Sequence, residues 1–176
     1  ILIKEKIDIK VCNGTEVYSN INMLSLIKDG TIATLNNSRY VLIELPMNQN
    51  NIFFKQMIYD LVSMGYIPII AHPERYIYVQ NNPNIVFDWL EQGSLLQANY
   101  GSFIGMYGRK AQKTVIKLLK HNTIHFLGTD CHRAESIYLK INLIREKIEK
   151  EVGKEGFYNI SYRNPRHIIE NKILKI

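Results

Sequence analysis

The sequence predicts an α/β fold in which parallel strands alternate with helices, as in a (β/α) barrel or a parallel sheet. Two observations carry this prediction. Short apolar segments alternate five times with segments of helical periodicity along the 176 residues. One segment, Tyr40 to Leu45, is apolar on both faces, which is typical of a parallel strand buried between layers of helices.

The first half of the chain contains three predicted strands. Ile7, Ile9 and Val11 alternate with polar residues as in a strand, which ends at Asn13 and Gly14. The elements predicted after it are a helix over 21–29 capped by Gly30, a strand over 40–45, a helix from about Phe53 ended by Gly65, and a strand over 67–71.

The second half continues the alternation. Its predicted elements are a helix over 83–92 followed by Gly93, a strand over 95–98, a helix over 109–120, a strand over 123–127, a long helix over about 134–152, and a final short helix from Pro165 with Asn164 as N-cap. A doubly wound sheet would show a Gly-rich phosphate loop, and the sequence has none. Because barrels close with about eight strands, five units predict most of a barrel that lacks its first units.

Composition is that of an ordinary globular protein, and we expect a single domain over residues 1–176. The chain is 46% hydrophobic, and a domain of this size buries roughly 70% of its unfolded surface. No apolar run reaches the ~18 residues that a membrane span needs. Cys12 and Cys131 are too few for a disulfide framework, so we expect a reducing cytoplasm.

The formal charge of +6 favours an anionic partner, such as a phosphorylated tail, an acidic membrane surface or nucleic acid. The basic residues lie in predicted helices and the C-terminal tail without interleaved aromatic residues, so nucleic acid is not expected and solvated helix faces explain most of them. The chain starts at Ile1 without an initiator Met or a signal-peptide pattern. We therefore expect that it begins inside a longer protein.

Five acidic or imidazole side chains lie at the ends of predicted strands and form the candidate metal site. They are Glu16, Glu44, His72, Asp130 and His132. Carboxylates mixed with imidazoles, supplied by separate strand ends, are what a multinuclear hydrolytic metal centre needs. Such a centre activates water and neutralises phosphoryl oxygens, so these residues favour phosphomonoester hydrolysis.

Most of the candidate residues also have a structural alternative. Glu44 is the only charged group in an apolar strand, so it needs either a metal or an arginine partner, for which Arg39 and Arg75 are available. His72 alone would be a core histidine, and Asp130 alone would be a helix N-cap. Arg75 is either a phosphate clamp or the partner of Glu74 or Glu44.

Residues 130 and 132 share a face if the strand continues through them, which directs Asp130 and His132 to the site and Cys131 away. A thiol phosphatase needs an arginine six residues after its cysteine, but Tyr18 and Ile137 stand there, so that mechanism is excluded. Three further predictions concern single residues: His125 is structural, His121 and His167 lie on the surface, and Tyr100 and Tyr107 pack in the fold or support a substrate ring.

The segments that contain these residues resemble the CpsB/YwqE-type tyrosine-protein phosphatases of bacterial capsule and exopolysaccharide loci, in the PHP (polymerase and histidinol phosphatase) superfamily. The resemblance rests on Gly14 to Tyr18, Asn36 to Glu44, Gly65 to Tyr76, Thr129 to His132 and Asn164 to Arg166, with Ala-His-Pro-Glu-Arg and Asp-Cys-His as the specific motifs. Family members open with an Asp-x-His-x-His strand that this chain does not contain.

The resemblance implies a distorted seven-unit (β/α) barrel that holds two or three divalent ions, with manganese preferred. It also implies cytoplasmic dephosphorylation of a membrane-associated bacterial tyrosine kinase, with no transmembrane segment. Arg133 would be a second phosphate contact, although Ala134 to Ser136 do not reproduce the family's later Gly-Arg-Pro arginine. A small-molecule phosphatase of the histidinol-phosphatase kind, and an inactive fragment that serves as a binding module, stay open as alternatives, as does homo-oligomerisation.

Overall fold

The chain was analysed as a computed structural model that describes residues 4, 6–133 and 137–174. Five strands form one parallel sheet whose spatial order follows the chain: β1 (Glu16–Tyr18), β2 (Tyr40–Glu44), β3 (Ile67–Ala71), β4 (Leu95–Asn99) and β5 (Phe126–Gly128). Every neighbouring pair is parallel. The predicted α/β class with five parallel strands is therefore confirmed. In this sheet β1 and β5 lie at the two edges.

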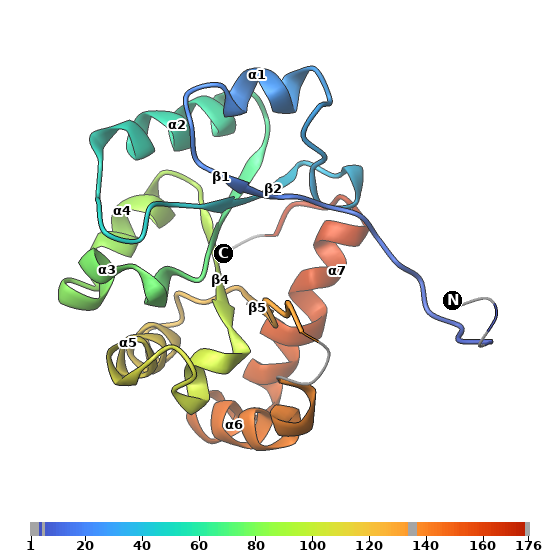
Figure 1. Cartoon of the computed structure of the whole chain (residues 1–176), viewed down its shortest axis with the longest axis vertical. Helices are drawn as coiled ribbons and strands as arrows, with labels where there is room; N and C mark the ends of the chain where they lie inside the picture. The colour runs from blue at the N-terminus through green and yellow to red at the C-terminus, as the bar shows by residue number, and fades with distance from the viewer. Residues whose placement is uncertain (1–3, 5, 134–136, 175–176) are drawn as a thin grey trace.

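Helices α1 to α6 lie around one side of the sheet, from α1 and α2 at the top of Figure 1, past α3 to α5, to α6 at the bottom, and α7 lies on the other side. Their bounds are α1 (Met23–Lys28), α2 (Ile52–Ser63), α3 (Ile77–Asn81), α4 (Ile85–Glu91), α5 (Arg109–Lys120), α6 (Ile141–Tyr158) and α7 (Asn164–Ile169). Short 3-10 segments are η1 (Leu35–Asn37), η2 (Pro73–Arg75), η3 (Tyr100–Ile104) and η4 (Tyr138–Lys140), and a π-helical turn, η5 (Asn159–Arg163), joins α6 to α7. Among the described residues, no helix is long and apolar enough to cross a membrane.

Both faces of the sheet are buried, as its apolar strands predict. One face packs with the surrounding helices in the main core, which includes Val41, Ile43, Ile70, Leu96 and Ala98. The other face, which we call the inner face, forms a smaller cluster of Tyr40, Leu42, Ile69, Ala71, Leu95 and Phe126. Ile168 of α7 and Leu174 of the C-terminal segment pack against this inner face.

Tyr40 holds the C-terminal segment in place over the inner face. Its hydroxyl donates to the Lys172 carbonyl at 2.7 Å and accepts the Leu174 amide hydrogen at 3.0 Å. The polar end of this otherwise buried side chain is thereby satisfied by backbone groups. Glu44, which ends β2, and His72, which follows β3, lie at the opposite ends of these strands.

The predicted first strand is wrong. Residues 7–11 form no strand, and Ile7, Ile9 and Val11 are 51%, 61% and 73% exposed. Figure 1 shows this segment leaving β1 and projecting away from the body of the molecule. The alternation of residue types is compatible with a strand, but a strand also needs a neighbour to bond with, and β1 is instead the segment that pairs with β2.

Several other elements also differ from their predicted bounds. The last strand starts at Phe126 rather than Thr123, and α4 is shorter than the predicted 83–92. The long helix begins at Ile141 and runs on to Tyr158, while residues 134–136 of the predicted span lie outside the described residues. Asn164 is not an N-cap: its backbone is helical, and its side chain donates to the His125 carbonyl at 2.9 Å, because η5 continues the helix into α7.

Candidate metal centre

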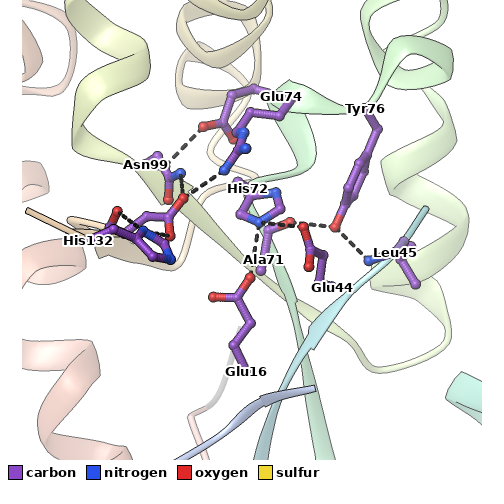
Figure 2. A network of polar contacts seen from close by, with 11 residues as sticks. Glu16, Glu44, Leu45, Ala71, His72, Glu74, Tyr76, Asn99 and His132 are labelled. Carbon is purple, nitrogen blue, oxygen red and sulfur yellow. Dashed lines mark hydrogen bonds and ion pairs between the residues drawn. The ribbon is translucent and has the colours of Figure 1, made fainter. Parts of the chain in front are cut away.

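Glu16, Glu44 and His72 meet on the inner face of the sheet, where β1, β2 and β3 lie side by side. Glu44 ends β2 and His72 directly follows β3. Glu16 is the first residue of β1 rather than its end, but its register partner is Leu42, so its side chain shares a face with Leu42 and Glu44. Figure 2 shows both carboxylates directed at the same ring nitrogen of His72, Nε2.

The donor atoms of these three residues are close enough to share one ion. His72 Nε2 lies 3.0 Å from Glu16 Oε1 and 3.6 Å from Glu44 Oε1. One ligand atom from each residue falls within 4.8 Å of the others. His72 is buried, whereas each glutamate side chain is about one-third exposed, so the cluster opens toward solvent on its carboxylate side. Two carboxylates and an imidazole suit a divalent ion of the manganese, iron or zinc kind.

The backbone at His72 turns sharply to place this ring. His72 has φ 34° and ψ 55°, the left-handed region that non-glycine residues rarely adopt. The turn continues as η2, so that Glu74 points toward β4 while Arg75 returns to the site. His72 is buried like a core histidine, but its Nε2 faces the two carboxylates and its Nδ1 has no hydrogen-bond partner among the described residues.

Asp130 and His132 lie at the same cavity of about 370 Å³, which is lined by Glu16, Glu44, His72, Arg75, Asp130 and His132. Asp130 is not part of the three-residue group. Its Oδ2 accepts from Arg75 Nη1 at 2.6 Å and from Asn99 Nδ2 at 3.0 Å, and its Oδ1 is 3.5 Å from His132 Nδ1. The structure therefore brings the five predicted metal ligands to one cavity. They form two groups there: Glu16, Glu44 and His72 in one, and Asp130 and His132 in the other.

The prediction that residues 130–132 continue the strand is wrong. The strand ends at Gly128, and Asp130 has a φ of 49°. His132 consequently stands at the rim, with its side chain 85% exposed. Cys131 packs against the main core, which agrees with its predicted direction away from the site. Arg133 is exposed and its carbonyl accepts from Cys131 Sγ, so the structure does not place this arginine with the cavity residues.

Arg75 is held from two sides. Its guanidinium binds Asp130, and its Cζ lies 4.5 Å from the centre of the Tyr107 ring. The predicted alternatives, pairing with Glu44 or Glu74, are wrong, since the ion pair forms with Asp130. Arg39, the other suggested partner of Glu44, bonds Asn171 instead. Tyr107 therefore packs against Arg75, and its role as a support for a substrate ring stays a prediction.

A buried carboxyl group lies behind Arg75. Glu74 is fully buried, and its Oε1 accepts from the Asn99 amide at 3.0 Å and from Ser102 Oγ at 2.6 Å. Burial raises the pKa of Glu74, against the lowering effect of the Ser102 hydrogen bond. The sequence analysis missed Asn99, which joins Glu74 to Asp130. The sequence could have indicated Asn99, because it is a polar residue that ends a buried strand, as Glu44 does.

A larger cavity, of about 540 Å³, lies where β5 begins and contains His125. This histidine is structural, as predicted: it is 5% exposed, and its Nδ1 accepts the Leu96 amide hydrogen at 3.1 Å. Burial lowers the pKa of His125 to about 4, so the ring is neutral at pH 7. None of the described residues that line this cavity carries a carboxylate, so they do not offer the mixed donor set of the first one.

This chain is similar to several known proteins. Residues 2–170 match the protein family described as "Capsular polysaccharide synthesis, CpsB/CapC". The tyrosine-protein phosphatase YwqE of Bacillus subtilis is 31% identical over 173 residues, which is 98% of this chain and 68% of YwqE. The tyrosine-protein phosphatase CpsB of Streptococcus pneumoniae is 27% identical over 95% of this chain and 71% of its own length.

A third relative, CapC of Staphylococcus aureus, is 35% identical over 128 residues, and the matched part spans half of its length, 50%. Among solved structures, a chain from the crystal structures of YwqE and CpsB matches with a TM-score of 0.92 and 30% identity, over 99% of this chain and 70% of that one. Those two proteins are described as metal-dependent tyrosine phosphatases. A metal centre at Glu16, Glu44 and His72 is consistent with that description.

Proposed function

Because this chain belongs to the CpsB/CapC family of capsular polysaccharide synthesis proteins, we propose that it is a metal-dependent phosphatase that hydrolyses phosphotyrosine in proteins. One observation carries the proposal. Two carboxylates and a buried imidazole converge within 4.8 Å, and a guanidinium lines the same cavity. Metal ions held by such ligands can activate water, and an arginine guanidinium can bind phosphoryl oxygens, which together suit transfer of a phosphoryl group to water.

The residues of the cavity have different roles in this proposal. Glu16, Glu44 and His72 would hold the first divalent ion, and Asp130 Oδ1 and His132 would contribute to a second position. A bound divalent ion lowers the pKa of water and neutralises phosphoryl oxygens. Arg75 binds the non-bridging oxygens of the phosphoryl group, while Asp130 and Tyr107 orient its guanidinium. Arg133, an exposed residue that follows His132 in the sequence, is a second phosphate contact in this proposal.

Finer parts of the proposal follow from the family resemblance. The parallel sheet, in which strand order follows chain order, is a segment of a PHP-type (β/α) barrel, and residues 1–176 belong to one domain. Two or three ions, with manganese preferred, occupy the intact site. The substrate is a membrane-associated bacterial tyrosine kinase, met at the cytoplasmic face of the membrane.

The test is hydrolysis of a phosphotyrosyl peptide compared with histidinol phosphate, with metal content measured on the same samples by elemental analysis. We expect manganese-dependent turnover of the peptide, its loss on chelation, and loss of bound metal in Glu44→Gln and His72→Ala. Cys131→Ser should keep most of the activity, because the chain has no thiol-phosphatase arginine. Preference for histidinol phosphate would point to a small-molecule phosphatase, and metal-loaded protein without turnover would point to a binding module.

A further inference from the structure

Tyr76 lies beside the candidate metal centre, with its ring next to that of His72, and is fully buried. The η2 turn brings it back toward β2, where its hydroxyl makes two hydrogen bonds. The oxygen accepts the Leu45 amide hydrogen at 2.9 Å, and the hydroxyl donates to the Ala71 carbonyl at 2.8 Å (Figure 2). Both hydrogen-bonding functions of the hydroxyl are therefore used on the backbones of two strands.

These two backbone groups adjoin the metal ligands. Leu45 directly follows Glu44, and Ala71 directly precedes His72. The last register pair between β2 and β3 is Ile43 with Ile70, so the Tyr76 hydroxyl joins the two strands just beyond their paired region. At this point the separation of the strands is set by a side-chain oxygen between an amide and a carbonyl, rather than by a direct backbone hydrogen bond.

The Tyr76 ring also supports the ligand imidazole. The His72 and Tyr76 ring centres are 5.6 Å apart in an edge-on arrangement. Metal-bound histidines are usually oriented by a hydrogen bond from their second nitrogen, but His72 Nδ1 has none among the described residues. The orientation of the His72 ring therefore depends on packing, and the Tyr76 ring is one of the groups that pack against it.

Tyr76 is itself fixed by other aromatic residues. Its ring stacks on that of Tyr78 with centres 5.5 Å apart and planes within 10° of each other. It also meets Trp89 edge-on at 6.5 Å. A side chain locked in this way holds its hydroxyl in one place, which a positioning group must do.

We propose that Tyr76 is a positioning residue of the metal centre, whose hydroxyl sets the separation between the strand ends that carry Glu44 and His72. The proposal rests on the proposed function, because it assigns the residue to that same metal site. Tyr76 touches neither substrate nor ion in this proposal. It acts through the backbone of β2 and β3.

The test compares Tyr76→Phe with Tyr78→Phe. Both variants remove one hydroxyl from the same aromatic stack, but the Tyr78 hydroxyl is buried without a hydrogen-bond partner among the described residues. Two quantities are measured: the Kd for Mn²⁺ by calorimetry, and hydrogen exchange at the Leu45 amide by NMR in metal-free protein. For Tyr76→Phe we expect a Kd weaker by about 10- to 100-fold, the usual effect of losing an outer-shell partner, and faster Leu45 exchange. Tyr78→Phe should change neither.

A third variant separates positioning from general stability. Val79→Ala shortens another fully buried side chain nearby, in α3, and should lower the urea midpoint while leaving the Mn²⁺ Kd unchanged. An unchanged Kd in Tyr76→Phe, or an equal loss in all three variants, would overturn the proposal. If the unaltered protein binds no Mn²⁺, the proposed function fails, and the Leu45 exchange rate still decides whether the hydroxyl joins the two strand ends.

Discussion

Arg75 combines two supports that together point its guanidinium into the cavity, the Asp130 carboxylate at 2.6 Å and the face of Tyr107. An arginine fixed in this way needs little reorganisation when charge develops on a phosphoryl group. The alternative is a purely structural ion pair, which would serve stability alone. The two roles differ in what a substitution changes.

We expect Arg75→Ala to lower kcat by roughly 10²–10³, about 3–4 kcal/mol of transition-state stabilisation, with the fold retained. Arg75→Lys should recover only part of this loss, because a point charge cannot form the forked contact. Arg145→Ala is the matched control, since Arg145 also pairs with a carboxylate, Glu149, and lies over an aromatic ring, Phe157.

Three measurements on the same samples decide the role of Arg75: kcat, metal occupancy and melting temperature. A normal kcat at full metal occupancy, with a lowered melting temperature, would make Arg75 a structural residue.

His125 makes the stability of the fold depend on pH. Burial lowers its folded pKa to about 4 from an ordinary value of 6.5. Between these values the unfolded chain binds a proton that the folded chain does not, so stability is full above pH 6.5 and falls as pH falls. The loss attributable to His125 is about 3 kcal/mol near pH 4.

Urea unfolding between pH 7.5 and 4 tests this linkage in the unaltered protein and in His125→Asn, whose amide oxygen can accept the Leu96 hydrogen in place of Nδ1. The variant should lose less stability than the unaltered protein over this range. Parallel stability curves for the two proteins would show that His125 is not the group responsible.

At the scale of single elements, α2 shows how local chemistry sets a boundary. Asn51 is in an extended conformation before the helix, and its side chain accepts the Phe53 amide hydrogen at 3.1 Å. Asn84 precedes α4 without such a bond from its side chain. Two asparagines in the same formal position therefore differ in whether they cap a helix.

We expect Asn51→Ala to lower the free energy of unfolding by about 1 kcal/mol, because it leaves an amide at the helix start without its acceptor. Asn84→Ala should change it by less than about 0.5 kcal/mol. Chemical denaturation of both variants, at one pH and without metal, gives the comparison. Equal losses would mean that the Asn51 bond contributes nothing to stability.

For the whole molecule, the proposed metal site predicts that metal binding and folding are coupled, since Glu16 lies in β1, Glu44 ends β2 and His72 follows β3. The site forms only when β1, β2 and β3 are assembled, so an ion that binds there stabilises the folded state. Free Mn²⁺ at a hundred times its Kd should raise the free energy of unfolding by about 2.7 kcal/mol.

Thermal unfolding with and without Mn²⁺ measures this coupling. Glu44→Gln should remove most of the increase, whereas Glu146→Gln, on the exposed side of α6, should retain it. The same increase in both variants would place the bound ion elsewhere on the protein.

Much of the fold could be predicted because its signals are local. The bounds of β3 and α5 agree with the predicted 67–71 and 109–120, since apolar runs and helical periodicity depend on neighbours in sequence. Gly30 and Gly65, predicted to end helices, have positive φ values of 80° and 84°, a conformation that glycine adopts at little cost. These features need no knowledge of distant residues.

The sequence by itself determined the α/β class and the types of residue that line the cavity, because residue chemistry and periodicity are written locally. Only the tertiary structure decided which segment pairs with β2. Residues 16–18 form this pair, and the alternating residues 7–11 do not. The tertiary structure also separated Asp130 from the Glu16, Glu44 and His72 group, through a positive φ at Asp130 and its bond to Arg75. Strand pairing, turn direction and the choice among ion-pair partners depend on residues far apart in the chain, whose approach no local pattern encodes.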